Sequence, residues 1–184
     1  MTLQDLYQKA ISFAAIAHKN QMVPGQQYSY VVHFSEVAME VLFSQNDGGT
    51  GLASDIDLGL AMQCALLHDT LEDTETTYEQ LKEAFGRAVA DGVLALTKNR
   101  DLDKPLQMVD SLCRIVLQPK EIQMVKMADR ITNLQEPPSH WTPEKIRSYQ
   151  NEARLIYDYL KDCCELLARR LEIKIEEYDA YINK

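Results

Sequence analysis

Four residues of the chain, His33, His68, Asp69 and Asp129, have side chains of the types that bind a divalent cation. Two imidazoles and two carboxylates form a mixed set of nitrogen and oxygen ligands that suits such a cation. A cation that keeps open coordination positions makes water a usable nucleophile near neutral pH. These residue types therefore indicate metal-dependent hydrolysis of a phosphorylated compound.

A second group of polar residues surrounds the His-Asp dipeptide. His68, Asp69, Glu72 and Asp73 directly follow the apolar run 65–67. If one helix carries all four, they lie within an arc of about 140° on its surface. Burying four polar groups without partners is costly, so we expect them to face a cleft, with Glu72 and Asp73 beside the metal ligands. The alternative is a solvated acidic face of an ordinary helix.

The case for the two remaining candidate ligands, Asp129 and His33, depends on this group. Asp129 and Asn133 are one helical turn apart and project from the same side of a helix. Taken alone, an aspartate such as Asp129 is usually a surface residue paired with a neighbouring Lys or Arg. A lone histidine at a helix start, such as His33, is more often a helix cap or a partly buried polar residue. Together with the His-Asp dipeptide, each becomes a candidate ligand.

The elements that must position these residues are helical nearly throughout. Apolar residues recur at helical spacing, and alternation typical of strands is nearly absent. The expected helices cover residues 3–20, 33–44, 54–71, 77–86, 87–97, 105–118, 120–134, 142–162 and 166–182. The pattern predicts an all-α fold, a helical bundle with the metal site in a central cleft, and one domain over residues 1–184.

Several of the helix boundaries have specific signals. The pairs Ser54–Asp57 and Thr77–Gln80 match capping boxes. Thr142–Pro143 predicts another start, because proline is favoured at the first helical position. Loops are expected at residues 20–32 and 46–51, where Gly, Pro and polar residues interrupt the pattern.

Composition narrows the class of protein. The sequence is 46% hydrophobic and 26% charged, as is typical of a globular domain. No apolar run approaches the roughly 20 residues of a membrane span, and the N-terminus lacks the pattern of a secretory signal. The net charge of −9 argues against nucleic acid as the main partner. We expect a cytoplasmic protein, without a membrane partner, that acts on a small anionic substrate.

The four cysteines fit a reducing compartment. They are Cys64, Cys113, Cys163 and Cys164. None form a Cys-x-x-Cys pair, and the adjacent Cys163 and Cys164 have poor geometry for an ordinary disulfide. We expect reduced and mostly buried thiols, as in cytosolic proteins, with zinc binding as a minor alternative.

Several strings of the sequence match a known family. They are His33, His68-Asp69-x-x-Glu72-Asp73, Lys126-x-Ala-Asp129-Arg-x-x-Asn133, Thr74–Leu81, Phe85-Gly86 and Val93–Lys98. With them the chain resembles the hydrolase domain of the RelA/SpoT alarmone enzymes, which belongs to the HD phosphohydrolase superfamily. The resemblance covers about residues 3–160. The synthetase and regulatory domains of long members do not fit in this length, so the chain looks like a small, stand-alone alarmone hydrolase.

The resemblance implies specific roles. It implies a Mn²⁺ ion held by the four ligand candidates, namely His33, His68, Asp69 and Asp129. It implies that Glu72 and Asp73 handle the attacking water and proton transfer, and that Asn133 contacts the nucleotide. Lys98 and Lys126, which lie in family-like strings, are the preferred phosphate contacts, ahead of Arg100 and Lys104. The implied reaction removes the 3′-pyrophosphate of (p)ppGpp and yields GDP or GTP and pyrophosphate.

The sequence departs from the family in one loop. Members typically carry an Arg-Lys pair that holds the guanine base, whereas this chain has Met22-Val23-Pro24 and no Lys or Arg between Lys19 and His33. Arg stacks on a purine and donates directed hydrogen bonds, which Met and Val do not. Stacking by Tyr28 or Tyr30 is one alternative, and packing of these tyrosines on the core is the other.

Other hypotheses stay open at this point. The enzyme class could hold with another substrate, such as NADPH or a nucleoside phosphate. A non-catalytic nucleotide-binding module is a further hypothesis, although Glu72 and Asp73, which the fold itself does not need, are both present. His18 and Gln21 could support the metal ligands from outside, or His18 could cap its helix. His140 and Trp141 receive no role.

Overall fold

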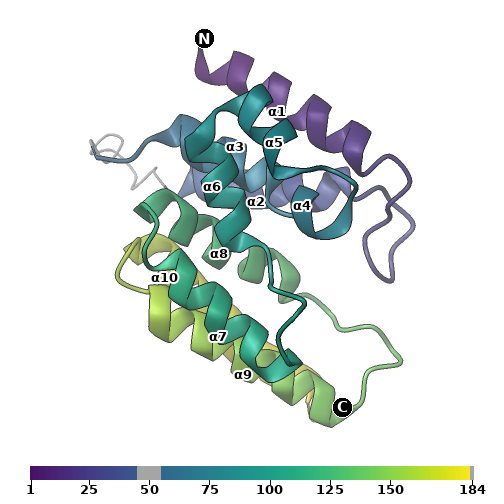
Figure 1. Ribbon diagram of the computed structural model, residues 1–184. Coiled ribbons are helices and arrows are strands. Elements are labelled where there is room, and N and C mark those ends of the chain that lie inside the picture. The colour runs from purple at the N-terminus through teal and green to yellow at the C-terminus, as the bar shows by residue number, and fades with distance from the viewer. Residues whose placement is uncertain (45–54, 183–184) are drawn as a thin grey trace.

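Helices account for nearly all regular structure in the computed structural model, which describes residues 1–44 and 55–182 (Figure 1). The α-helices are α1 (Leu3–Ala17), α2 (Val31–Phe43), α3 (Leu58–Leu67), α4 (Thr70–Asp73), α5 (Tyr78–Phe85), α6 (Arg87–Leu96), α7 (Lys104–Ile115), α8 (Lys120–Asn133), α9 (Pro143–Leu160) and α10 (Glu165–Glu177). A 3₁₀ turn (Tyr178–Tyr181) follows. Within the described ranges, extended pairing is limited to one bridge between Met22 and Ser29. The predicted all-α fold is confirmed.

Side-chain caps set several helix starts. Thr77 and Gln80 form the predicted capping box at the start of α5. The hydroxyl of Thr142 accepts a hydrogen bond from the backbone N–H of Lys145, as expected for the cap of α9. Ser54 and the predicted turn at 46–51 lie outside the described residues. Asp57 caps α3 itself, and the helix begins at Leu58.

The helix expected to run through Leu71 is shorter than predicted. α3 ends at Leu67, and α4 starts at Thr70, so His68, Asp69, Glu72 and Asp73 do not share one helix. Two side chains donate hydrogen bonds to backbone carbonyl groups at this point. His68 Nδ1 donates to the oxygen of Ala65 at 2.8 Å, and Thr70 Oγ1 donates to the oxygen of Leu67 at 2.6 Å. Such side-chain bonds compete with the helical ladder, which explains the break.

Helix α8 occupies the centre of the molecule. It packs against α2 and α3 on one side and against α9 and α10 on the other. Figure 1 shows α8 crossing the middle of the view, with α1 and α5 above it and α7, α9 and α10 below. The predicted ligand Asp129 therefore lies on the most enclosed helix, opposite the helices that carry the two histidines.

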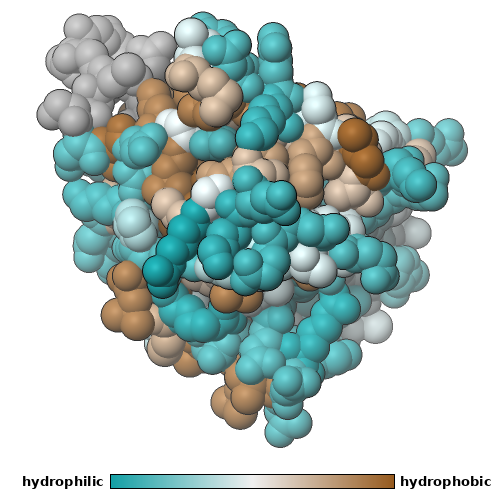
Figure 2. Space-filling view, turned by 45° about the horizontal axis from the view of Figure 1, so that its top comes forward, coloured by the Kyte–Doolittle hydropathy of each residue, from teal (hydrophilic) through white to brown (hydrophobic). Residues whose placement is uncertain are grey.

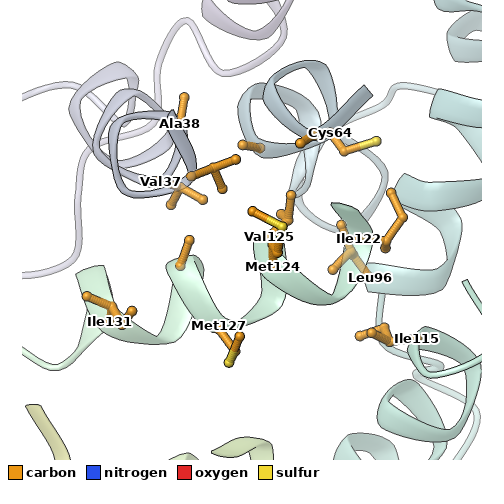
Figure 3. Close-up of a cluster of buried hydrophobic side chains, with 14 of the residues drawn as sticks. Val37, Ala38, Cys64, Leu96, Ile115, Ile122, Met124, Val125, Met127 and Ile131 are labelled. Atoms are coloured by element: carbon orange, nitrogen blue, oxygen red, sulfur yellow. The ribbon is translucent and has the colours of Figure 1, made fainter. Parts of the chain in front are cut away.

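The apolar core surrounds the first half of α8 (Figure 3). Met124, Val125 and Met127 are fully buried, and α2, α3, α6 and α7 contribute further side chains around them. α6 approaches α8 closely at Gly92, where an added Cβ would lie 2.5 Å from Ile122 Cδ1. A side chain larger than hydrogen does not fit there without movement. This packing fixes α8, and with it Asp129, relative to the other helices.

A charged pair joins α10 to α2. Arg170 donates from Nε and Nη2 to the two carboxylate oxygens of Glu40, each at 2.6 Å. The Glu40 side chain is buried, while Arg170 is half exposed. Paired N–H donors on one carboxylate are the strong geometry for such a contact. This pair ties the C-terminal helix to the helix that carries His33.

Polar residues cover most of the face shown in Figure 2, where apolar residues occur in small groups. Within the described residues, no helix combines the length and the apolar character that crossing a membrane requires. The four cysteines are free, and Cys64 is buried in the core.

Candidate metal centre

The three helices α2, α3 and α8 bring the candidate ligands together. His33 lies in the first turn of α2, His68 follows the last residue of α3, and Asp129 lies in the last part of α8. Their ligand atoms all lie within 4.8 Å of one another. The two Nε2 atoms of the histidines are 3.3 Å apart, although 35 residues separate them in the sequence. This is the arrangement of a shared ligand set.

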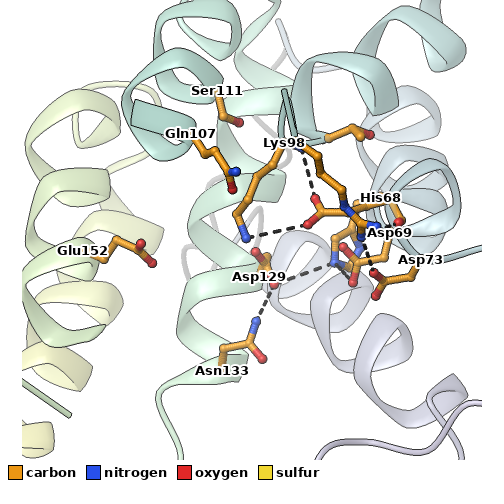
Figure 4. A network of polar contacts seen from close by, with 12 residues as sticks. His68, Asp69, Asp73, Lys98, Gln107, Ser111, Asp129, Asn133 and Glu152 are labelled. Atoms are coloured by element: carbon orange, nitrogen blue, oxygen red, sulfur yellow. Dashed lines mark hydrogen bonds and ion pairs between the residues drawn. The ribbon is translucent and has the colours of Figure 1, made fainter. Parts of the chain in front are cut away.

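Asp69, the fourth candidate ligand, lies against both histidines. Its Oδ2 atom lies 3.0 Å from His68 Nε2 and 3.6 Å from His33 Nε2. Asp129 Oδ1 lies 3.6 and 3.7 Å from the same two nitrogens. In Figure 4, His68, Asp69 and Asp129 turn their polar ends toward one small region. The structure thus gathers all four residues that the sequence singled out as ligands.

The surroundings of these side chains fit a cation. His68 Nδ1 donates to the backbone oxygen of Ala65, so its Nε2 is free to act as a ligand when the ring is neutral. Burial disfavours charge on His68, but the carboxylates of Asp69 and Asp129 outweigh it and raise its pKa well above the usual value. A positive charge is therefore stabilised at this point. With its hard, mixed donor set, the cluster suits a divalent metal.

Tyr30 orients one of the candidate ligands. Its hydroxyl donates to Asp69 Oδ2 at 2.6 Å. The buried ring stacks beside His18 and His33, with ring centroids 5.1 and 4.9 Å away. Burial and then the Asp69 carboxylate raise the pKa of Tyr30 far above its usual value, so the hydroxyl keeps its proton. Stacking of Tyr30 on a base, one of the sequence-based alternatives, does not fit this position.

His18 supports the site from further out. Its Nδ1 atom lies 2.6 Å from Gln21 Oε1, and its ring is buried beside Tyr30. Gln21 Nε2 in turn donates to Asp73 Oδ2 at 3.2 Å. His18 and Gln21 therefore connect the end of α1 to Tyr30 and to one of the predicted catalytic carboxylates.

Two residues predicted to contact substrate also bond to Asp129. The Lys126 ammonium lies 3.0 Å from Asp129 Oδ2 and is buried, with 7% of the residue exposed. Asn133 donates to Asp129 Oδ1 at 2.6 Å. Burial disfavours the charged form of Asp129, but Lys126 and His68 outweigh it and lower the pKa of the carboxyl well below its usual value. Lys126 is thus placed to keep this carboxylate ionised and oriented.

The predicted catalytic pair lies beside the ligand cluster and under basic side chains. Glu72 Oε2 accepts a hydrogen bond from the backbone N–H of Lys98 at 3.1 Å, and the Lys98 ammonium is 3.8 Å from Oε1. Arg100 Nη2 lies 3.5 Å from Asp73 Oδ1 and donates to the backbone oxygen of Glu72 at 2.7 Å. Figure 4 shows Lys98 reaching toward the space beside Asp129. Both carboxylates are held in place while their side chains stay partly open to solvent.

A basic cleft opens on the Glu72 side of the cluster. We use this name for the cavity of about 560 Å³ that Glu72 lines together with Lys98, Arg100 and Arg114. Lys98, Arg100 and Arg114 bring positive charge to this cavity, which the carboxylate of Asp101 also lines. Arg100, which the sequence analysis ranked behind Lys98 and Lys126 as a phosphate contact, lies at this cleft.

A second cavity adjoins the cluster on the His33 side. It has a volume of about 260 Å³, and we call it the aromatic pocket. His33 and Asn133 form its wall toward the metal ligands, and Trp141, Tyr149 and Tyr28 are among its other lining residues. Sequence analysis assigned no role to Trp141, because its position in a loop after two prolines does not reveal what it packs against. The only sequence signal was an aromatic residue directly before a helix cap.

Comparison with known proteins agrees with this arrangement. A family model described as HD domain matches residues 10–163. The guanosine-3′,5′-bis(diphosphate) 3′-pyrophosphohydrolases MESH1 of Danio rerio and Drosophila melanogaster are 28% and 26% identical to the chain. The first alignment covers 89% of this chain and 89% of the relative, and the second covers 93% and 91%.

A bacterial relative and a solved structure extend the comparison. The guanosine-3′,5′-bis(diphosphate) 3′-pyrophosphohydrolase of Aquifex aeolicus is 32% identical over 155 residues, which is 82% of this chain but 20% of that protein. A structure described as a metazoan ortholog of SpoT that hydrolyzes ppGpp superposes with a TM-score of 0.80 at 23% identity, and covers 94% of both chains. At that identity the likeness establishes the fold.

Proposed function

Because the chain belongs to the HD domain family, we propose that it is a metal-dependent hydrolase that removes the 3′-pyrophosphate of (p)ppGpp. The observation that carries this proposal is the convergence of His33, His68 and Asp129 within 4.8 Å, with Asp69 against both histidines. Relatives that this chain covers almost completely are named as hydrolases of that nucleotide. The predicted products are GDP or GTP and pyrophosphate.

We propose Mn²⁺ as the metal, with His33, His68, Asp69 and Asp129 as its ligands. When bound, the ion would offset negative charge on the phosphoryl oxygens and lower the pKa of water in the site. The chain supplies the surroundings of this ion. Tyr30 fixes the orientation of Asp69 through the 2.6 Å hydrogen bond, and such outer partners tune both the orientation and the basicity of a ligand.

In the proposed reaction, water adds to the phosphorus attached to the 3′-oxygen, and the bond between that phosphorus and the 3′-oxygen breaks. Glu72 and Asp73 are the proposed proton acceptor and donor: one takes the proton of the attacking water, and the 3′-oxygen ends protonated. Lys98 and Arg100 hold this pair and bring positive charge to the side where pyrophosphate forms. Lys126 and Asn133 also hold Asp129, and their contact with the substrate stays a prediction.

Two broader predictions remain proposals. We propose that residues 1–184 form a single HD-type domain, which is supported by the match over residues 10–163 and by the packing of α10 against α8 and α9. We also propose a cytoplasmic location. Its support is that the four cysteines are free thiols, the usual state in a reducing compartment.

The direct test combines metal analysis with a panel of nucleotides. Metal-free protein is incubated with Mn²⁺ and ppGpp, pppGpp, NADPH or nucleoside triphosphates, and the products are identified. We expect GDP and pyrophosphate from ppGpp, and we expect Asp69→Ala to lose both metal binding and turnover. Equal or faster cleavage of a compound without guanine would assign another substrate. Binding of ppGpp without cleavage would assign a non-catalytic module.

A further inference from the structure

Arg114 lines the basic cleft, but its guanidinium bonds to the protein itself. Building on the proposed function, we propose that Arg114 is a positioning residue for the proton transfer. It fixes the peptide unit between Thr97 and Lys98, and this peptide unit holds the carboxylate of Glu72. Sequence analysis assigned no role to Arg114, which lies near the end of α7, far from the metal ligands in the sequence.

The end of α6 depends on side chains of another helix. Thr97, the residue after the last turn of α6, has extended backbone (φ −70°, ψ 129°). The last carbonyl groups of a helix have no partner within the helix and need one from elsewhere. Ser111 Oγ on α7 donates to the oxygen of Ala95 at 3.3 Å. One turn later, Arg114 Nη1 donates to the oxygens of Leu94 and Ala95 at 2.8 and 3.0 Å. α7 therefore caps the C-terminus of α6.

The same guanidinium reaches one residue beyond the helix. Arg114 Nη2 donates to the oxygen of Thr97 at 2.8 Å. Asp110, one turn earlier on α7, faces the other N–H groups: Nε donates to its Oδ2 at 3.0 Å, and Nη2 lies 2.9 Å from the same oxygen. A guanidinium has five N–H donors and no acceptor. All five are directed at groups of the chain, so Arg114 acts on the substrate through the residues that it holds.

The peptide unit that Arg114 holds is the one that holds Glu72. The oxygen of Thr97 and the N–H of Lys98 belong to one planar peptide unit, in which they point in opposite directions. The N–H donates to Glu72 Oε2 at 3.1 Å. Because the unit is rigid, a hydrogen bond to its oxygen sets the direction of its N–H. Two hydrogen bonds and one peptide unit thus join Arg114 to a proposed catalytic carboxylate.

This backbone contact is the firmer of the two that Glu72 makes with Lys98. The ammonium lies 3.8 Å from Glu72 Oε1, and the Lys98 side chain is 35% exposed. It stands at the end of a flexible four-carbon stem, whereas the N–H is part of the backbone. The direction of the carboxylate therefore depends mainly on the peptide unit. A displacement of about 1 Å in a catalytic group costs roughly 100-fold in rate, so the support of that unit matters for turnover.

Two substitutions of Arg114 separate positioning from charge. Arg114→Met removes all five donors. Arg114→Lys keeps the positive charge in the basic cleft, but the three donors of an ammonium do not replace the five of the guanidinium. We expect both variants to lower kcat for ppGpp roughly 10- to 100-fold and to change KM by less than about threefold. Arg87→Met is the matched control, because Arg87 pairs with Asp91 at 3.2 Å on the exposed start of the same helix, α6. Its kcat stays unchanged.

A double-mutant cycle tests whether the effect passes through Glu72. In the Glu72→Gln background, we expect Arg114→Met to lower the remaining kcat by less than about twofold, because the carboxylate that it positions is already gone. A residue that only stabilises the fold would lower kcat by the same factor in both backgrounds. Thermal melts followed by circular dichroism set an assay temperature at which every variant is folded.

Hydrogen exchange gives a reading that needs neither metal nor turnover. The amide of Lys98 is protected from exchange while Glu72 accepts its hydrogen bond. Loss of a hydrogen bond to a charged group corresponds to roughly tenfold or more in exchange rate. We expect Arg114→Met to speed exchange of the Lys98 amide by about that factor, as measured by NMR. The control Arg87→Met leaves this rate unchanged.

The outcomes separate this inference from the proposed function. Full kcat in Arg114→Met, kcat restored in Arg114→Lys, or an equal loss with and without the Glu72 carboxylate overturns the positioning role. Cleavage of ppGpp by the unmodified protein would still uphold the function. If the unmodified protein cleaves no nucleotide, the function is overturned and the exchange of the Lys98 amide decides. Faster exchange in Arg114→Met then upholds the hydrogen-bonded path to Glu72, and unchanged exchange overturns it.

Discussion

Replacing Tyr30 by phenylalanine isolates one hydrogen bond to a candidate metal ligand. The hydroxyl donates to Asp69 Oδ2 at 2.6 Å, while the ring is buried beside His18 and His33. Phenylalanine fills the same space, so Tyr30→Phe removes the bond and keeps the packing. The variant therefore tests how strongly the orientation of Asp69 affects the affinity for the metal.

Two estimates of the effect agree. A hydrogen bond to a charged group contributes about 1.5–3 kcal/mol. Loss of an outer partner of a metal ligand typically lowers metal affinity roughly 10- to 100-fold, which corresponds to about 1.4–2.8 kcal/mol. We therefore expect the Kd for Mn²⁺ to rise about 10- to 100-fold in Tyr30→Phe. Turnover at saturating Mn²⁺ should change much less, because Glu72 and Asp73 are untouched.

Isothermal titration of metal-free protein with Mn²⁺ measures this directly, and activity at increasing Mn²⁺ gives a second reading. Tyr28→Phe is the matched control: the residue lies in the same loop and is 43% exposed. Its Kd should stay unchanged. A Kd for Tyr30→Phe within twofold of the unmodified protein, or an equal change in the control, would refute the reasoning.

Three further substitutions test other parts of the structure. Glu72→Gln should keep Mn²⁺ affinity and lower kcat roughly 100- to 10,000-fold; unchanged kcat would remove Glu72 from the proposed mechanism. Gly92→Ala places a methyl group against Ile122 Cδ1, and denaturant unfolding should show a loss of about 1–3 kcal/mol; a neutral result would mean that α6 shifts freely. Arg170→Met leaves the buried carboxylate of Glu40 unpaired. With Arg170 half exposed, the same assay should show a loss of about 1–3 kcal/mol, below that for a fully buried pair, and an unchanged midpoint would contradict the role of this pair.

Sequence reasoning singled out four residues that the structure brings together, because the chemistry of candidate ligands is visible in the residue types. Histidine and aspartate in a short string, followed by an aspartate on a later helix, indicate a cation before any coordinates exist. The helix between Ser54 and Leu71 was predicted less well. The hydrophobic periodicity continues across His68 and Asp69. The helix nevertheless ends there, because the side chains of His68 and Thr70 donate hydrogen bonds to backbone carbonyls of the preceding turn. Such bonds have no periodic signal.

The substrate contacts show a second limit. Lys126 lies in a family-like string and carries a positive charge, so sequence reasoning placed it on phosphate, and that contact stays a prediction. Sequence reasoning missed the second contact, in which the buried ammonium lies 3.0 Å from Asp129 Oδ2 because helices pack on both sides of α8. Trp141 shows the reverse case, a loop residue without a motif that reaches a cavity beside the ligands. Both outcomes depend on tertiary packing, which spacing along the chain does not encode.

The ligand cluster also has a consequence for folding. Its members come from α2, the α3–α4 junction and α8, so a bound ion would join three separate segments of the chain as a cross-link does. An unfolded chain does not hold these ligands together and therefore does not bind the ion. Free metal at 100 times its Kd would thus stabilise the native state by about 2.7 kcal/mol. Thermal melts recorded with different divalent ions would thus rank the preferred metals without any substrate.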